Sequence, residues 1–172
     1  MQPSFALTTI NPSVVIGPPV NIPSSGSKLN ETLAPIWKMF SGAMDTIPPN
    51  IGSASAVDVR DVAYAHVWAF ENSSKADGER YITSLGYGPL QSAADVLRKE
   101  YKGTAIGDKI PVGIPGDTYV GYNEETSEVE EIKYPPGRPR IDGSKASKAM
   151  GFTYITYKQS VIDTAKAFEQ LL

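Results

Sequence analysis

The 172-residue sequence contains no cysteine and a single histidine, His66. The absence of cysteine excludes disulfides, cysteine-ligated zinc and a thiol nucleophile. With one histidine and no serine or cysteine partner at a recognisable spacing, a hydrolase triad and a histidine-rich metal site both lack support. We therefore predict no metal site, and we expect His66 to be a packed or surface residue of a helix.

Long apolar runs and basic clusters are also missing. No apolar run approaches the about 18 residues that a membrane-spanning helix needs, and Met1 to Pro3 lack the charged and apolar regions of a signal peptide. A net charge of -3 and a pI near 5.2 provide no basic field for nucleic acid or an anionic membrane. These absences predict a cytoplasmic protein with neither nucleic acid nor membrane as a partner, and they indicate nothing about its oligomeric state.

The sequence has no glycine-rich loop suited to a phosphate. Gly86 and Gly88 lack the third glycine of a dinucleotide-binding turn. The stretch from Gly137 to Lys145 has five residues between its glycines where a phosphate loop has four, and it has prolines where N–H donors are needed. No part of this chain is therefore expected to cradle a phosphate.

The most informative stretch that is present runs from Phe5 to Pro19. Phe5 to Ile10 is apolar and β-branched without polar alternation, which predicts a strand buried on both faces of a parallel sheet and closed by Asn11 and Pro12. Val14 to Ile16 then predicts a stiff segment at the carboxyl end of that strand, where open α/β sheets bind ligands. A plain core strand with a proline-rich exit fits the same residues equally well.

The remaining elements follow in alternation. Leu29 to Phe40 has helical spacing interrupted by Pro35, and the turn-rich residues 43–52 lead to a short strand at 55–59. The pattern also predicts a strand at 78–83, a helix opened by Pro89, a non-strand segment at 110–116, a short helix capped by Asp142, and a last helix whose capping box is Thr156 and Gln159. Five glutamates between Glu124 and Glu131 predict a solvated, mobile segment without chemistry.

Asp58, Arg60 and Asp61 allow two interpretations. Two carboxylates beside an arginine are compatible with acid–base chemistry. The same residues also serve a strand-to-helix turn in which Asp61 caps a helix at 62–71 and an arginine ion pair holds the turn. We favour the structural interpretation.

Several motifs occur in one order: Asn11 to Pro18, Ser55 to His66, Gly78 to Ile82, Asp142 to Lys145, and Met150 to Phe152. Together they resemble the C-terminal half of extended short-chain dehydrogenases/reductases, most closely the fungal NADPH-dependent aldehyde and ketone reductases related to plant dihydroflavonol reductase. The resemblance implies an α/β fold, namely the C-terminal part of a Rossmann-type doubly wound sheet plus a small α/β substrate-binding lobe. It implies that residues 1–19 and 53–71 belong to the sheet and residues 20–52 and 72–172 mainly to the lobe. It also implies that the N-terminal dinucleotide-binding half of such enzymes is not part of this sequence.

The resemblance also implies a function and a set of site residues. The parent protein is expected to transfer a hydride from NADPH to a small aldehyde or ketone. The cofactor-binding residues implied are Pro12, Ser13, Val14, Val15 and Ser27, and the substrate-pocket residues implied are Ile16, Trp37, Ile47 and Asn50. No catalytic residue is expected in this chain, so by itself it is expected to be inactive.

Tyr154 and Lys158 match the Tyr-x-x-x-Lys pattern of the family by spacing alone. The chemistry needs both residues on one helical face, where the ammonium lowers the pKa of the phenol. The predicted capping box begins the helix at Thr156 and leaves Tyr154 outside it, and in family order the pair lies far beyond the catalytic position. We therefore reject it as a catalytic pair.

Two other functions remain open. One is a catalytically inactive binding or assembly module. The other is an epimerase or dehydratase of the same superfamily that acts on nucleotide sugars, for which Arg60, Arg138 and Arg140 are the candidate diphosphate ligands.

Overall fold

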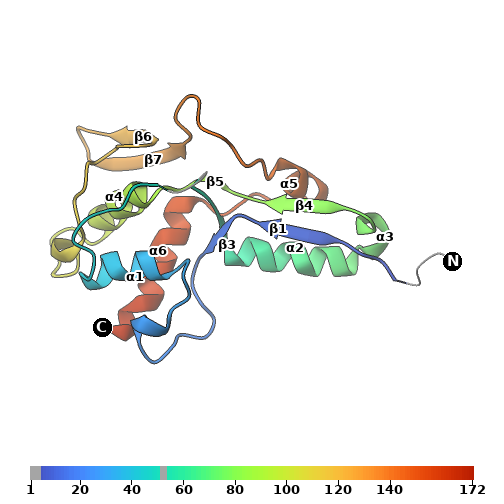
Figure 1. The fold of residues 1–172 in the computed structure, drawn as a ribbon, viewed down its shortest axis with the longest axis horizontal. Coiled ribbons are helices and arrows are strands. Elements are labelled where there is room, and N and C mark those ends of the chain that lie inside the picture. The colour runs from blue at the N-terminus through green and yellow to red at the C-terminus, as the bar shows by residue number, and fades with distance from the viewer. Residues whose placement is uncertain (1–4, 51–53) are drawn as a thin grey trace.

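The computed structural model describes residues 5–50 and 54–172, and these form an elongated molecule (Figure 1). One end holds β1 (Thr9–Pro12), β4 (Arg80–Thr83), α2 (Val59–Glu71), α3 (Ser73–Ala76) and α5 (Ser144–Met150). The other end holds α1 (Ala34–Ser41), α4 (Leu90–Glu100), α6 (Tyr157–Phe168), β6 (Val120–Asn123) and β7 (Glu128–Lys133). The centre is formed by β2 (Val14–Ile16), β3 (Ser55–Asp58) and β5 (Gly86–Tyr87). Short 3-10 turns lie at Gly26–Lys28, Gly107–Lys109 and Glu169–Leu171.

The chain passes from one sheet to another at Ser13. β1 pairs in parallel with β4, whereas β2 pairs in parallel with β3, which pairs antiparallel with β5. The backbone N–H of Ser13 donates to the carbonyl of Thr83 at 3.0 Å, and its hydroxyl donates to the same oxygen at 3.4 Å. Ser13 is therefore fixed at the point where the first sheet ends and the second begins.

The prediction of a strand over Phe5 to Ile10, buried on both faces, is wrong. Phe5 and Leu7 are exposed, and the strand begins at Thr9 and includes Pro12. The physical reason is that β1 pairs only with β4 among the described residues, so one of its edges is open. The N–H groups of Thr9 and Ser13 donate to carbonyls on the β4 side. Successive residues of a strand direct their N–H groups to opposite edges, so Pro12 faces the open edge, where a residue without an N–H is tolerated. An apolar run does not reveal which strands lie beside it.

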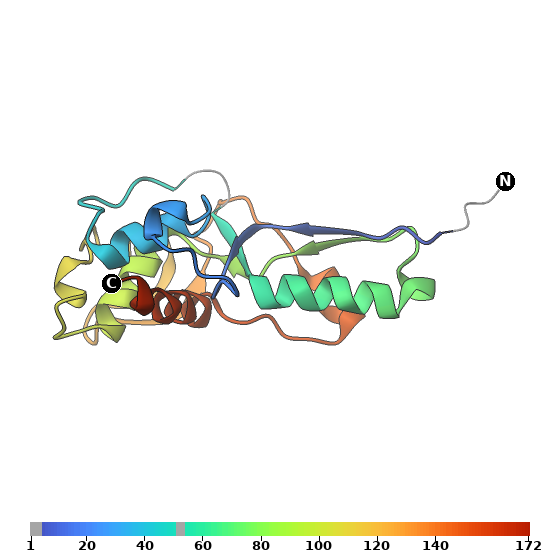
Figure 2. The same ribbon diagram turned by 90° about the horizontal axis from the view of Figure 1, so that it is seen from below.

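Two apolar clusters form the interior. The larger lies among α1, α4 and α6, where Phe40 packs edge-on against Tyr101 at 5.2 Å between ring centroids. The smaller fills the space between the β1–β4 pair and helices α2 and α5, and it contains Tyr81 and Met150. Viewed from below, α2 runs along one side of these two strands (Figure 2).

The predicted fold class is confirmed, because parallel strands are covered by helices and joined to a smaller α/β part. Several boundaries are also confirmed. α1 starts late, with Pro35 as its second residue, and α6 starts at Tyr157 with the Thr156 hydroxyl accepting from the N–H of Gln159 at 3.2 Å. The division into sheet and lobe residues stays a prediction, and residues 1–4 and 51–53 of its ranges lie outside the described residues.

Two further predictions are wrong. The glutamate-rich segment is a β-hairpin, β6–β7, in which Val129 is 2% exposed and Ile132 packs against the larger core cluster, while the glutamates of β7 face solvent. The cap of α2 is Asp58, which accepts from the N–H of Arg60 at 2.9 Å, so the helix begins at Val59 and Asp61 lies in its first turn. Within the described residues, no helix is long and apolar enough to cross a bilayer.

Candidate functional site

A cavity of about 440 Å³ lies beyond the carboxyl ends of the parallel strands β1 and β4. Val14 follows the end of β1 by two residues, and Gly88 follows the end of β4 by five. The remaining walls come from the start of α1, residues 48–50, the start of β3 and the side chain of Tyr157. Ligands of open α/β sheets bind at this end of the strands.

The walls of this main cavity are largely apolar, and most of their polar groups are already hydrogen-bonded. The Ser55 and Tyr134 hydroxyls lie 2.5 Å apart, and the Tyr157 hydroxyl donates to the carbonyl of Pro89 at 3.4 Å. Burial raises the pKa of Tyr157 far above its ordinary value, so its phenol stays protonated. Glu31, at the exposed rim, is the one charged residue among the described residues that line this cavity.

The structure brings three of the predicted site residues together. Val14, Ile16 and Asn50 line the main cavity. Ile47 lines a second cavity of about 340 Å³, which shares Pro48, Pro49 and Asn50 with the first. Ile16, Ile47 and Asn50 therefore lie around two adjoining cavities, and their substrate-pocket role stays a prediction.

The other predicted residues lie outside both cavities. Pro12 is on the open edge of β1, and Val15 is paired with Val57 inside the second sheet. Ser27 is exposed in the turn Gly26–Lys28, with its hydroxyl 2.8 Å from that of Ser25. Trp37 packs edge-on against Phe168 at 5.7 Å in the larger core cluster. Ser13 is held by Thr83, as described above.

Asn50 positions the wall between the two cavities. Its side-chain NH₂ donates to the Thr118 hydroxyl at 2.9 Å and to the Tyr87 hydroxyl at 3.4 Å. These bonds tie residues 48–50 to β5 and to the segment before β6. The amide that the sequence offers as a pocket group is thus engaged in holding the wall in place.

Sequence reasoning did not identify Gly88 and Tyr157 as cavity residues. A Cβ at Gly88 would lie 2.2 Å from the Tyr157 ring, so only glycine lets this ring close that side of the cavity. The signal in the sequence is the turn Gly86 to Pro89, whose glycines were tested only against the pattern of a dinucleotide-binding turn. Its glycine serves side-chain packing instead.

Tyr154 and Lys158 do not form an acid–base pair. The Tyr154 hydroxyl donates to the carbonyl of Gly143 at 3.0 Å, whereas the Lys158 ammonium donates to the carbonyl of Val129 at 3.2 Å. Burial raises the pKa of Tyr154, which is the opposite of what a neighbouring ammonium does to an activated phenol. Tyr154 also precedes α6, as the capping box predicts.

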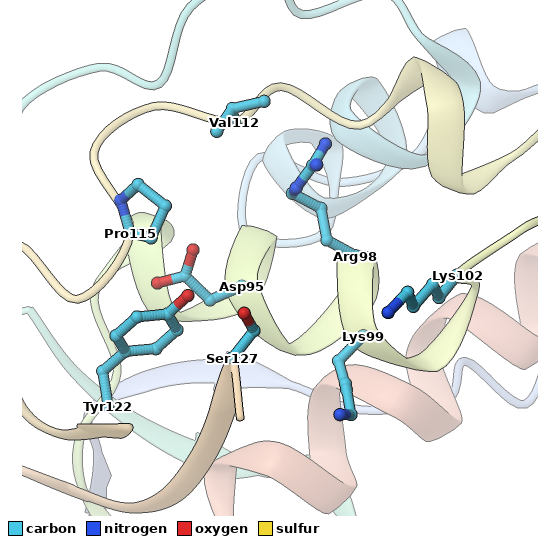
Figure 3. Close-up of a pocket in the computed structure, with 8 residues that line it drawn as sticks. All are labelled: Asp95, Arg98, Lys99, Lys102, Val112, Pro115, Tyr122 and Ser127. Carbon is cyan, nitrogen blue, oxygen red and sulfur yellow. The ribbon is translucent and has the colours of Figure 1, made fainter. Parts of the chain in front are cut away.

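A third cavity, of about 240 Å³, lies beside the C-terminal half of α4 (Figure 3). Two of its three cations are engaged elsewhere: Arg98 donates to the carbonyl of Ile110 at 3.0 Å, and Lys99 pairs with Glu128 at 3.2 Å. Figure 3 shows these two side chains pointing in opposite directions. The buried Asp95 carboxylate accepts from Gln91, from the N–H of Gly116 and from Tyr119. These bonds hold residues 110–119 onto α4, and we assign this cavity no chemistry.

Asp58 holds the junction that carries one wall of the main cavity. Its carboxylate is fully buried and accepts from the N–H, Nε and Nη2 of Arg60 at 2.8–2.9 Å and from the Ser160 hydroxyl at 2.6 Å. Arg60 also pairs with Asp163 of α6 at 2.8 Å. Gly17, with φ of 120°, passes so close that a Cβ would lie 3.1 Å from either carboxylate oxygen. The contacts support the structural interpretation of Asp58, Arg60 and Asp61, since they join β3 and α2 to α6.

Asp61 is buried, and no cation within the described residues forms an ion pair with it. Its Oδ2 accepts from the N–H of Ile155 at 3.0 Å, and burial raises the pKa of the carboxyl above its ordinary 3.8. A raised folded-state pKa means that ionisation opposes folding, so the stabilising contribution of Asp61 is complete below pH 3.8 and is lost as the pH rises through the folded-state pKa.

We therefore expect Asp61→Asn, which keeps an acceptor for Ile155, to raise the free energy of unfolding at pH 7 by about 1 kcal/mol. The gain over the unsubstituted chain should shrink as the pH falls toward 4. Urea unfolding followed by circular dichroism at several pH values measures it, with the exposed Asp45→Asn as the control. A variant that is less stable than the unsubstituted chain at pH 7 would show that the ionised carboxylate is needed.

Comparison with known proteins identifies the relatives of the chain. No family model matches it. An oxidoreductase of Schizosaccharomyces pombe is 33% identical over a match that covers 96% of the chain and 42% of that protein. The NADPH-dependent methylglyoxal reductase of Saccharomyces cerevisiae is 30% identical over a match that covers 94% of the chain and 42% of that protein. The crystal structure of yeast methylglyoxal/isovaleraldehyde reductase with NADPH matches 97% of the chain and 45% of that protein, with a TM-score of 0.70 and 25% identity.

These matches define a Rossmann-type reductase fold, which the observed α/β arrangement shares. The chain resembles the extended short-chain dehydrogenases/reductases, as its motifs predict, and its relatives include fungal NADPH-dependent methylglyoxal reductases. It spans a little under half the length of the relatives it matches.

Proposed function

We propose that the protein carrying this chain is an NADPH-dependent reductase of small aldehydes and ketones, and that this chain supplies the walls of its substrate site. The observation that carries the proposal is the apolar cavity beyond the ends of β1 and β4, in a chain whose relatives include NADPH-dependent methylglyoxal reductases. A cavity with apolar walls and few open polar groups suits a small carbonyl compound better than a sugar.

The residues at the start of the cavity fit a flat, mostly apolar ring such as nicotinamide. Val14 is half exposed at the cavity and Ile16 lies beside it on the same strand. Proline at 12 and the β-branched residues that follow Ser13 keep this stretch of backbone stiff. NADPH, when bound, supplies the hydride, and we propose that residues 12–15 orient its ring while the main cavity holds the carbonyl compound.

The chain excludes water from the reacting carbonyl through its apolar wall. Ile16, Ile36 and Ala56 line the main cavity and belong to the larger core cluster, so packing holds this wall in place. Asn50 and Ser55 keep their hydrogen bonds to the protein and hold the wall. We do not propose Tyr157 as the proton donor, since its hydroxyl already donates to the carbonyl of Pro89. The proposal includes a cytoplasmic location and no nucleic-acid partner, as the composition predicts.

The test is consumption of NADPH by the longest polypeptide that the gene encodes, with methylglyoxal, isovaleraldehyde and benzaldehyde as substrates. We expect one alcohol to form for each NADPH oxidised. Turnover of a nucleotide sugar without carbonyl reduction would instead favour the epimerase or dehydratase alternative. Binding of NADPH without turnover of any carbonyl compound would favour the inactive binding module.

A further inference from the structure

Glu31 lies at the rim of the main cavity and carries the one formal charge among the described residues that line it. It belongs to the short segment between the turn Gly26–Lys28 and α1, and Thr32 of the same segment also lines the cavity. Glu31 itself is exposed, whereas the walls behind it are largely apolar. A ligand that enters the main cavity from solvent therefore passes a single carboxylate.

The backbone around Glu31 is held in place by Asn30. The Asn30 side-chain oxygen accepts from the N–H of Leu33 at 3.0 Å and from the Thr32 hydroxyl at 3.1 Å. The Asn30 carbonyl accepts from the N–H groups of Leu33 and Ala34 at 3.2 Å and 2.9 Å. Leu33 is buried in the larger core cluster. These bonds tie the turn to the core, so the position of Glu31 at the rim is fixed although the residue is exposed.

The charge of Glu31 is not cancelled nearby. Within the described residues no cation forms an ion pair with it, and the ammonium of Lys28 donates to the Ser24 hydroxyl at 3.3 Å. The adjoining second cavity contains Asp117 and Arg138, whose formal charges sum to zero. Among the described residues that line the two cavities, the net formal charge is therefore that of Glu31. Apolar walls screen a charge less than water does, so its field extends into the main cavity.

Resting on the proposed function, we propose that Glu31 determines substrate specificity by repelling anionic carbonyl compounds from the rim of the main cavity. The substrate class is then aldehydes and ketones that are neutral or carry a positive charge, and oxo acids are disfavoured because they carry a carboxylate. A carboxylate brought to the rim meets a like charge and is repelled, whereas a cation is attracted. Selection of this kind acts through a repulsive contact with the wrong substrate and needs no additional contact with the right one.

The experiment compares three aromatic aldehydes that differ in the charge of the group opposite the aldehyde: 4-formylbenzoate, benzaldehyde and 4-(trimethylammonio)benzaldehyde. NADPH consumption by the longest polypeptide that the gene encodes gives kcat/KM for each, and each charged aldehyde is expressed as a ratio to benzaldehyde. We expect Glu31→Gln to raise the ratio for the anion about threefold and to lower the ratio for the cation about threefold. Glu31→Lys doubles the change in charge, so the ratio for the anion should rise about tenfold.

Glu71→Gln is the matched control, because it removes the same charge from an exposed position of α2 outside both cavities, and it should keep both ratios. The changes caused by Glu31→Gln should also shrink at about 1 M salt, where the Debye length is about 3 Å, whereas a steric effect of the side chain does not depend on salt. Ratios that stay constant or move in the opposite direction, while benzaldehyde is reduced, would overturn the role of Glu31 alone. Failure of all three aldehydes to be reduced would overturn the proposed function itself.

Discussion

Asp58→Ala is expected to lower the free energy of unfolding by about 3 kcal/mol. The substitution leaves Arg60 and the buried Ser160 hydroxyl without the acceptor that both share. It also removes the cap of α2, since Asp58 accepts from the N–H of Arg60. Urea unfolding of the 172-residue chain, followed by circular dichroism, measures the loss.

The control for this loss is Asp163→Asn. Asp163 is partly exposed and pairs with Nη2 of Arg60, so its replacement should cost less than about 1 kcal/mol. Equal losses in the two variants would mean that the arginine pair, and not the buried carboxylate, holds the junction. A loss below 1 kcal/mol for Asp58→Ala would contradict the role given to Asp58.

The pH dependence gives an independent measure of the same contacts. Burial by itself raises the pKa of Asp58, but the hydrogen bonds from Arg60 and Ser160, together with the charge of Arg60, outweigh it and lower the pKa below 3.8. A lowered folded-state pKa contributes stability that is present above pH 3.8 and is lost as the pH falls through the folded value. The difference in stability between the unsubstituted chain and Asp58→Ala should therefore shrink below pH 3.8.

The sequence predicted the elements that depend on local chemistry. Pro35 and the box of Thr156 and Gln159 place helix starts correctly, because proline geometry and side-chain caps act within a few residues. Burial depends on neighbours, which explains the error at Phe5 and Leu7. The glutamate-rich hairpin was missed because its high charge content obscures Val129 and Ile132, the two apolar residues of β7 that pack against the core.

The candidate site was predictable only where it follows the strand. Val14 and Ile16 lie directly after β1, and the rule for strand ends finds them from the sequence. Gly88 and Tyr157 come from segments about 70 residues apart in the sequence. No local pattern shows that the Tyr157 ring packs where a Cβ at position 88 would otherwise lie. Trp37 looks like a pocket residue by its position on α1, but the helix turns it toward Phe168.

Val14→Trp is expected to block the main cavity and to lower kcat/KM for a small aldehyde by about 100-fold, which corresponds to about 3 kcal/mol of transition-state stabilisation. Val14 is half exposed, lines the cavity and lies in a strand, where an aromatic residue is well tolerated. The larger side chain can therefore be accommodated without disturbing the core. Rates of NADPH consumption by the longest polypeptide that the gene encodes measure the effect.

The matched control is Val20→Trp, which makes the same chemical change at a residue that is 97% exposed and outside both cavities. Its kcat/KM and its thermal midpoint should equal those of the unsubstituted protein. If Val14→Trp keeps its thermal midpoint but loses activity, the loss comes from the cavity and not from unfolding. If Val14→Trp reduces aldehydes as fast as Val20→Trp, the carbonyl compound does not bind beside Val14, and the substrate must lie on another surface of the protein.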